Sequence, residues 1–205
     1  TMTIRPRLRD DSKYSHNIKN MHPDLTLLDA LHLSQALLPA HSELFSRLLE
    51  DFITRIDDQG FLSTQGAQVI ISTATNACPL LASLCLMLYE INPEAVSLQR
   101  VFPHLQRFFD LGWFKNAKPE HAELPTWEVP EQLQLDSGLF NFDIWRETGI
   151  GLDIRSAHSP ALAAMLLREA AALKKIAQIL GDRPARNGYD RWIKNLQEKI
   201  NSLWD

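Results

Sequence analysis

The sequence predicts an all-α protein built from helical hairpins. Three observations lead to this prediction. Apolar residues recur at the three- and four-residue spacing of amphipathic helices in six segments, glycine and proline stand near the ends of these segments, and only the short β-branched run Val69–Ile71 suggests an extended piece. With 205 residues, the chain is long enough for one domain with a well-formed core.

The first two expected helices lie close together in the chain. Leucines at helical spacing predict one helix over Leu25–Leu38, which stops at Pro39. The second is expected to begin after Ser42, a suitable N-cap residue, and to end at Gly60. The short link between them predicts an antiparallel helical hairpin.

A second hairpin is expected in the middle of the chain. Pro79 is acceptable at a first helical position and opens an apolar segment, Pro79–Glu90, which predicts a buried helix. Pro93 interrupts the pattern, and a further amphipathic helix is expected over Leu98–Phe109.

A third hairpin is expected near the C-terminus. Ser159 and Pro160 are typical of a helix start, and the apolar spacing that follows predicts a helix over Ser159–Gly181. The last helix is expected over Tyr189–Trp204. Residues 1–24 show no period and are interpreted as an N-terminal arm.

The two cysteines, Cys78 and Cys85, are expected within one apolar helix. At about 1.5 Å rise per residue their Cα atoms would lie about 10 Å apart, too far for a disulfide. They are therefore predicted to be reduced core residues, which favours a cytoplasmic location.

The charge pattern bears on possible partners. The formal net charge is -4, and the Lys and Arg residues are scattered apart from a short run at Arg5–Arg9. We therefore expect no nucleic acid partner. No apolar run approaches the roughly 20 residues that span a bilayer, so no membrane partner is expected either.

The segment Gln134–Gly151 is the candidate site. It combines carboxylates, an arginine, a tryptophan and three glycines, a composition that favours a loop over a helix or strand. Its aromatic residues can bury apolar area, so a structured functional loop is a better interpretation than disorder.

Several short segments suggest a known family. They are Asp57–Leu62, Ala77–Ala82, Leu135–Trp145, Ser159–Gly181 and Leu203–Asp205. In their order along the chain they resemble motifs of the (α/α)6-toroid glycoside hydrolases, in particular those around mannosylglycerate hydrolase, processing α-glucosidase and trehalase. For example, Leu135-Asp136-Ser137-Gly138, ending in Trp145, is similar to their Glu-Ser-Gly-x-Asp-x-Ser-x-Arg-Trp site loop.

This resemblance implies that residues 25–205 form part of an (α/α)6 toroid. The implied activity is hydrolysis of an α-glycosidic bond in a small saccharide or glycoside, with inversion and without a cofactor. The family's toroid has six hairpins, so a second chain or a missing C-terminal half is expected to complete it. One departure stands out, because Phe140 occupies the position of the family's catalytic acid.

Asp143 is the candidate acid if the loop is shifted relative to the family. It lies between Phe142 and Ile144, where burial would raise the pKa of its carboxyl group towards the range useful for protonating a leaving group. Inverting hydrolysis needs two carboxyl groups, of which this chain is expected to supply one. The alternative is that Asp143 is a solvated loop residue or a helix cap.

Other polar residues of the loop are candidates for binding sugar hydroxyls. Asp136 would accept hydrogen bonds from a hydroxyl group, or alternatively cap its own turn. Asn141 and Arg146 would also bind hydroxyls, with a salt bridge from Arg146 to Glu147 or Asp143 as the alternative.

Trp113, Trp127 and Trp145 are candidate platforms for sugar rings. A buried role in anchoring loops is the alternative for each of them. The seven histidines show no metal-ligand spacing, so no metal site is expected. The alternative function is a catalytically inactive carbohydrate-binding or helical interaction module.

Overall fold

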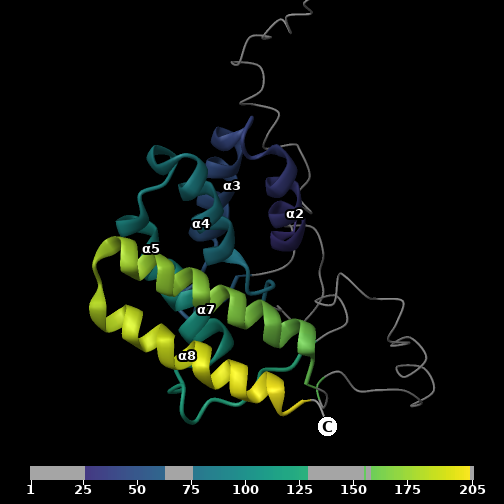
Figure 1. The fold of residues 1–205 in the computed structure, drawn as a ribbon. Helices are drawn as coiled ribbons and strands as arrows, with labels where there is room; N and C mark the ends of the chain where they lie inside the picture. The colour runs from purple at the N-terminus through teal and green to yellow at the C-terminus, as the bar shows by residue number, and fades with distance from the viewer. Residues whose placement is uncertain (1–25, 63–75, 129–154, 156–157, 204–205) are drawn as a thin grey trace, which may run out of the picture.

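The computed structural model describes residues 26–62, 76–128, 155 and 158–203. Within these ranges the chain forms helices and no strand, which confirms the all-α prediction (Figure 1). The α-helices are α2 (Leu27–Leu37), α3 (Ser42–Thr54), α4 (Leu81–Ile91), α5 (Leu98–Arg107), α7 (Pro160–Leu180) and α8 (Arg183–Asn201). A 3₁₀ helix, η2 (Pro93–Ala95), precedes α5, and a π-helix, η3 (Phe108–Trp113), follows it.

Helices α2 and α3 form the first expected pair. Thr26 and Asp29 make a capping box at the start of α2: the Thr26 hydroxyl accepts from the Asp29 amide at 3.1 Å, and the Asp29 carboxylate accepts from the Thr26 amide at 3.3 Å. The two helices pack against each other across a short link, as predicted (Figure 1). Ser42 is the first residue of α3 and His41 occupies the cap position, so the expected N-cap at Ser42 is one residue late.

The expected extension of α3 to Gly60 is wrong, since the helix ends at Thr54. The reason is a turn organised by Asp57, whose carboxylate accepts from the backbone amides of Gln59 and Phe61, both at 2.8 Å. An aspartate that bonds its own following backbone competes with the helical ladder. Gly60 completes the turn with φ 75°.

Helix α4 begins at Leu81 and not at Pro79. The Leu80 amide donates to the Cys78 carbonyl at 2.9 Å, so these residues form a tight turn before the helix. Cys78 therefore lies outside α4, which corrects its expected helical position. Both cysteines are free and buried, and burial raises the pKa of the Cys78 and Cys85 thiols to about 11 and 12, so both stay protonated at neutral pH.

Helices α7 and α8 form a long hairpin (Figure 1). The expected start and end of α7 are confirmed: the Ser159 hydroxyl accepts from the Leu162 amide at 3.3 Å, and Gly181 ends the helix in the left-handed conformation with φ 73°. Helix α8 begins at Arg183, earlier than the expected Tyr189. Asp182 caps it by accepting from the Ala185 amide at 2.9 Å.

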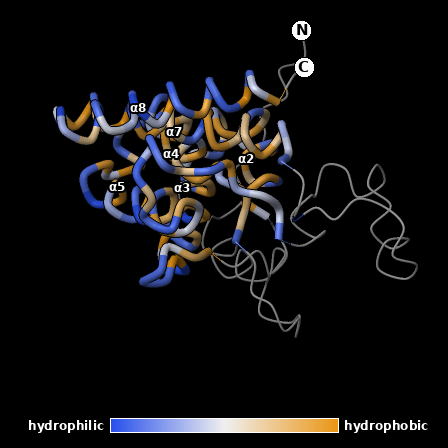
Figure 2. Tube along the Cα trace, turned by 90° about the horizontal axis from the view of Figure 1, so that it is seen from below, coloured by the Kyte–Doolittle hydropathy of each residue, from blue (hydrophilic) through white to orange (hydrophobic). Residues whose placement is uncertain are grey.

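Helix α4 lies at the centre of the described helices and packs against α2, α3, α5 and α7. Its buried residues are on several faces, in agreement with the all-round apolar pattern of its sequence. Helix α8 covers the outer side of α7 and buries only one face. In Figure 2 the turns of α8 on the side away from the other helices are coloured as hydrophilic.

An aromatic cluster joins η3 to α8. The Phe114 ring lies 4.1 Å from the Trp192 ring and 5.0 Å from the Phe109 ring, measured between centroids. Phe109 also meets Tyr189 edge-on at 5.9 Å. These contacts hold the end of η3 against the C-terminal hairpin and position the chain segment that follows it.

In the described ranges, no helix is long and apolar enough to cross a membrane. The expected N-terminal arm, residues 1–24, and the brief extended piece Val69–Ile71 lie outside those ranges.

Candidate functional site

Most of the predicted site lies outside the described residues. This holds for the candidate acid Asp143 and for the candidate hydroxyl-binding or stacking residues Asp136, Asn141, Trp145 and Arg146. Their roles stay predictions. The structure does describe both ends of the long connection that contains them.

Trp113 and Trp127 come together in the structure. Their rings meet edge to face with centroids 6.1 Å apart and an interplanar angle of 81°. Trp113 is 8 % exposed and Trp127 is 3 % exposed, so most of the surface of each side chain is buried against other residues. Whether either ring also contacts a ligand stays a prediction, but Trp113 lines the pocket described next.

A pocket of about 520 Å³ opens beside Trp113, and we call it the Trp113 pocket. Four pieces of the chain build it: Asn76 in the segment before α4, the end of η3 with the turn that follows it, the coil over residues 122–128, and the approach to α7. Its lining residues are Asn76, Gly112, Trp113, Phe114, Lys115, Ala117, Ala122, Glu123, Leu124, Pro125, Thr126, Glu128, Arg155 and His158.

The turn after η3 gives the pocket its first wall. Asp110 and Leu111 carbonyl groups accept from the amides of Asn116 and Lys115 at 2.7 Å and 3.0 Å, which closes the π-helix. Lys115 and Asn116 both have positive φ, 49° and 61°. Two successive left-handed residues without glycine are uncommon, and such strain gathers at functional sites, as π-helical turns also do.

The backbone at Gly112, which belongs to this wall, lies in close contact with the backbone at Gly60. A Cβ atom added to Gly112 would lie 2.1 Å from the Gly60 carbonyl oxygen, and one added to Gly60 would lie 2.2 Å from the Arg107 carbonyl oxygen. Only glycine fits at either position. The turn after α3 and the end of η3 are therefore in direct backbone contact.

The pocket lining carries charges of both signs. Lys115 and Arg155 are basic, Glu123 and Glu128 are acidic, and Thr126 adds a hydroxyl group. Such a lining offers hydrogen-bond donors and acceptors together. It does not select strongly for a charged ligand of one sign.

Two carboxyl groups outside the pocket are also chemically notable. Burial raises the pKa of Asp110 to about 6, against the opposing effect of a hydrogen bond from the Tyr189 hydroxyl at 3.4 Å. Burial raises the pKa of Glu169 to about 7, although donors from Ala82 and Ser83 act in the opposite direction. Both groups tie helices together and neither lines the Trp113 pocket.

Sequence reasoning identified Trp113 but missed Asn76, Lys115 and the glycine crossing. The lysine and asparagine after η3 carried a weak signal, because asparagine tolerates the left-handed region. The crossing of Gly60 and Gly112 gave no local signal, since it joins residues far apart in the chain. In the described part of the chain, no group of three or more potential ligands could hold a metal ion.

Comparisons of this chain with protein-family profiles, curated proteins and solved structures found no significant match.

Proposed function

We propose that this chain is part of a glycoside hydrolase-like protein and that the Trp113 pocket binds a small saccharide. The observation that carries the proposal is the pocket itself, which has a volume of about 520 Å³ and an indole in its wall. Ligand sites for small molecules commonly measure about 300–1,000 Å³.

The chemistry of the lining supports a sugar more than a charged metabolite. Each sugar hydroxyl group both donates and accepts, and the carboxylates of Glu123 and Glu128 can accept where Lys115 and Arg155 can donate. The two acidic and two basic side chains balance in charge, so a ligand of either sign meets both attraction and repulsion, whereas a neutral polyol would use both kinds of group.

Hydrolysis is the activity that the family resemblance implies. In this proposal the helical hairpins belong to an (α/α)6 toroid, and Asp143 protonates the leaving oxygen of an α-glycosidic bond. The second carboxyl group, which activates water in an inverting mechanism, would come from a second chain or from a C-terminal half.

The alternative proposal is a catalytically inactive carbohydrate-binding or helical interaction module. Phe140 supports it, because phenylalanine at the family's acid position cannot donate a proton. The Trp113 pocket serves binding equally well in both proposals.

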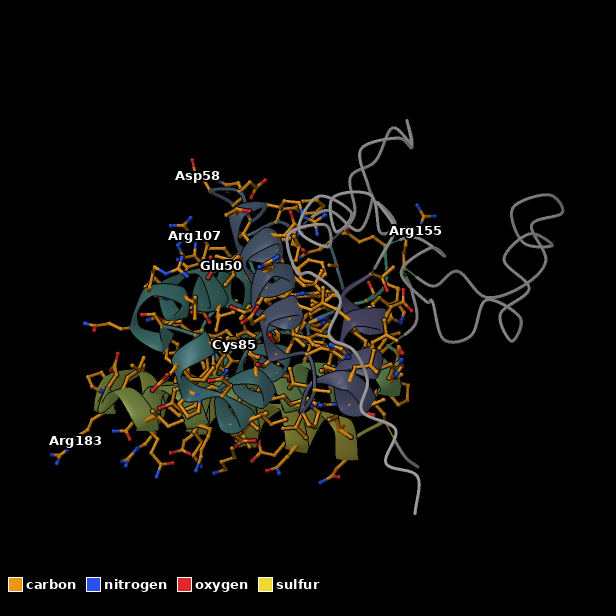
Figure 3. All side chains as sticks on the ribbon, turned by 90° about the horizontal axis from the view of Figure 1, so that it is seen from above. Glu50, Asp58, Cys85, Arg107, Arg155 and Arg183 are labelled. Carbon is orange, nitrogen blue, oxygen red and sulfur yellow. The ribbon has the colours of Figure 1, made fainter. Side chains whose placement is uncertain are left out.

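Binding can be tested by calorimetry with α-linked disaccharides of glucose and mannose. Arg155→Ala should weaken binding about tenfold, because charge-assisted hydrogen bonds to a ligand are lost. Arg183→Ala is the matched control, since Arg183 lies at the far end of the molecule from Arg155 (Figure 3). Equal affinities for both variants, or no binding by the wild type, would remove the pocket from the proposal.

Catalysis is tested separately by release of reducing sugar. In the complete assembly, Asp143→Asn should abolish hydrolysis and leave saccharide binding within about threefold of the wild type. Binding without turnover by the wild type would favour the inactive module, and full activity of Asp143→Asn would exclude this residue as the acid.

A further inference from the structure

Two of the side-chain hydrogen bonds of Asn76 join separate parts of the chain. Its Oδ1 atom accepts from the Leu62 amide at 3.0 Å, and its Nδ2 atom donates to the Gly112 carbonyl at 3.0 Å. Asn76 is 4 % exposed, so water does not compete freely for these groups.

The backbone around Asn76 strengthens this connection. The amide of the next residue, Ala77, donates to the Leu62 carbonyl at 2.7 Å. Leu62 is therefore bonded through both its amide and its carbonyl to the segment that precedes α4. This segment in turn reaches η3 through the Asn76 amide group, so three parts of the chain meet at one side chain.

The contact leaves little freedom to the end of η3. Gly112 meets Gly60 so closely that neither residue can carry a Cβ atom, which means that a small shift of one backbone requires a shift of the other. The Gly112 carbonyl also accepts a hydrogen bond from Asn76 Nδ2, so Gly112 is held by Asn76 as well as by Gly60. The direction in which the chain leaves η3 is thereby determined.

This direction matters for the Trp113 pocket because Gly112, Trp113, Phe114 and Lys115 are consecutive residues of its wall. Asn76 itself lines the same pocket. A rotation of the Gly112 peptide would move the indole of Trp113 and the strained turn at Lys115 together. The asparagine thus lies where it can set the shape of the pocket while it also contributes to its surface.

We infer that Asn76 is the positioning residue of the Trp113 pocket, and that its amide group sets the wall over residues 112–115 by bridging Leu62 and Gly112. The inference rests on the proposed function of the pocket in binding a saccharide. It requires a group that accepts on one side and donates on the other, which an amide provides and a carboxylate does not.

This requirement makes Asn76→Asp a sharp test. An ionised carboxylate can still accept from the Leu62 amide but repels the Gly112 carbonyl, whereas the protonated carboxylic acid restores a donor to it. At each pH between 4.5 and 9 the affinity of the variant for the saccharide is compared with that of the wild type. The ratio should approach one at low pH and fall about tenfold as the carboxyl group ionises.

Two control variants accompany this measurement. Asn76→Ala removes both groups, so its affinity should be lower than that of the wild type at every pH, without recovery in acid. Asn92→Asp is the matched substitution elsewhere: the Asn92 side chain donates to the Ser42 hydroxyl at 3.2 Å and does not line the pocket. The affinity ratio of Asn92→Asp to the wild type should stay constant with pH.

A second readout needs no ligand. The indole ¹⁵N–¹H resonance of Trp113, assigned with Trp113→Phe, should move with pH in Asn76→Asp and stay in place in Asn92→Asp. A Trp113 resonance that keeps its wild-type position in Asn76→Asp at every pH would overturn the positioning role. If the resonance moves but the wild type binds no saccharide, the positioning role stands and the proposed function fails.

Discussion

Glu169 is a fully buried carboxylate that joins two helices. It belongs to α7, and its oxygens accept from the Ala82 amide at 2.5 Å and from the Ser83 amide and hydroxyl at 3.0 Å each. These donors are at the start of α4, where the cap residue Leu80 provides no side-chain acceptor. A residue from another helix therefore caps α4, and the positive end of its dipole faces the carboxylate.

The pH dependence of stability follows from the direction of the Glu169 shift. Its pKa is raised from 4.5 to about 7, so the folded state holds the proton more tightly than the unfolded state. This contribution to the free energy of unfolding is fully present below about pH 4.5 and is lost as the pH rises to about 7, a change of about 3 kcal/mol. Asp110, with its pKa raised to about 6, acts in the same direction.

Glu169→Gln should flatten this dependence, because the amide does not titrate. Urea unfolding followed by circular dichroism at pH 5, 6, 7 and 8 measures the change. Glu198→Gln is the control, since Glu198 is exposed on α8 and its carboxylate lies 4.0 Å from the Lys194 amine. If the slopes of Glu169→Gln and the wild type agree, Glu169 does not titrate in this range.

Gly112 offers a second prediction for a single residue. Gly112→Ala places a Cβ atom 2.1 Å from the Gly60 carbonyl oxygen, so it should lower the free energy of unfolding by about 3 kcal/mol. Gly188→Ala is the matched control, because a Cβ there meets nothing within 4 Å and α8 gains a better helix former. The control should raise stability by about 0.5–1 kcal/mol. Equal effects of the two variants in thermal unfolding would contradict the close crossing.

At the scale of the elements, sequence patterns located the six α-helices of the described residues and failed at some of their ends. The ends that were right have local causes, such as the Ser159 cap and the left-handed Gly181 of α7. Among the ends that were wrong, those of α3 and α4 depend on a competing turn or on distant residues, whereas the start of α8 has a local cap, Asp182. Helix α4 starts where Glu169 supplies acceptors from a distant part of the chain, and α3 stops before the turn made by Asp57.

The early start of α8 depends on its cap. Asp182→Ala should lower the free energy of unfolding by about 1 kcal/mol, because the Ala185 amide loses its acceptor. Asp182→Asn retains an acceptor oxygen and should cost less than half as much. Chemical denaturation of both variants separates loss of the cap from loss of charge; equal destabilisation would assign the effect to the charge.

At the scale of the whole molecule, the α7–α8 hairpin determines which surfaces remain available. Helix α7 covers α4 and α5, while α8 contributes Tyr189 and Trp192 to the aromatic cluster beside η3. This cluster supports the segment that forms the Trp113 pocket. The pocket wall is thus held from one side by the C-terminal hairpin and from the other by Asn76.

If a second copy of the chain completes the toroid, the mass of the assembly in solution is predictable. If two copies complete the toroid, light scattering should give twice the chain mass of 23.4 kDa, and dilution should lower the mean value. A mass of 23.4 kDa at all concentrations would exclude self-association as the source of the second carboxyl group. The proposal would then depend on a C-terminal half of the same chain.

Sequence patterns predicted where the helices lie and that the cysteines are buried, because periodicity, capping residues and composition act over short distances. Tertiary packing brings Trp113 against Trp127 beside a pocket, places Glu169 at the start of α4 and lets Asn76 bridge Leu62 and Gly112. These contacts join residues widely separated in the chain, and their geometry depends on how whole helices pack. A local sequence pattern therefore does not indicate which distant residue will contact it after the helices pack.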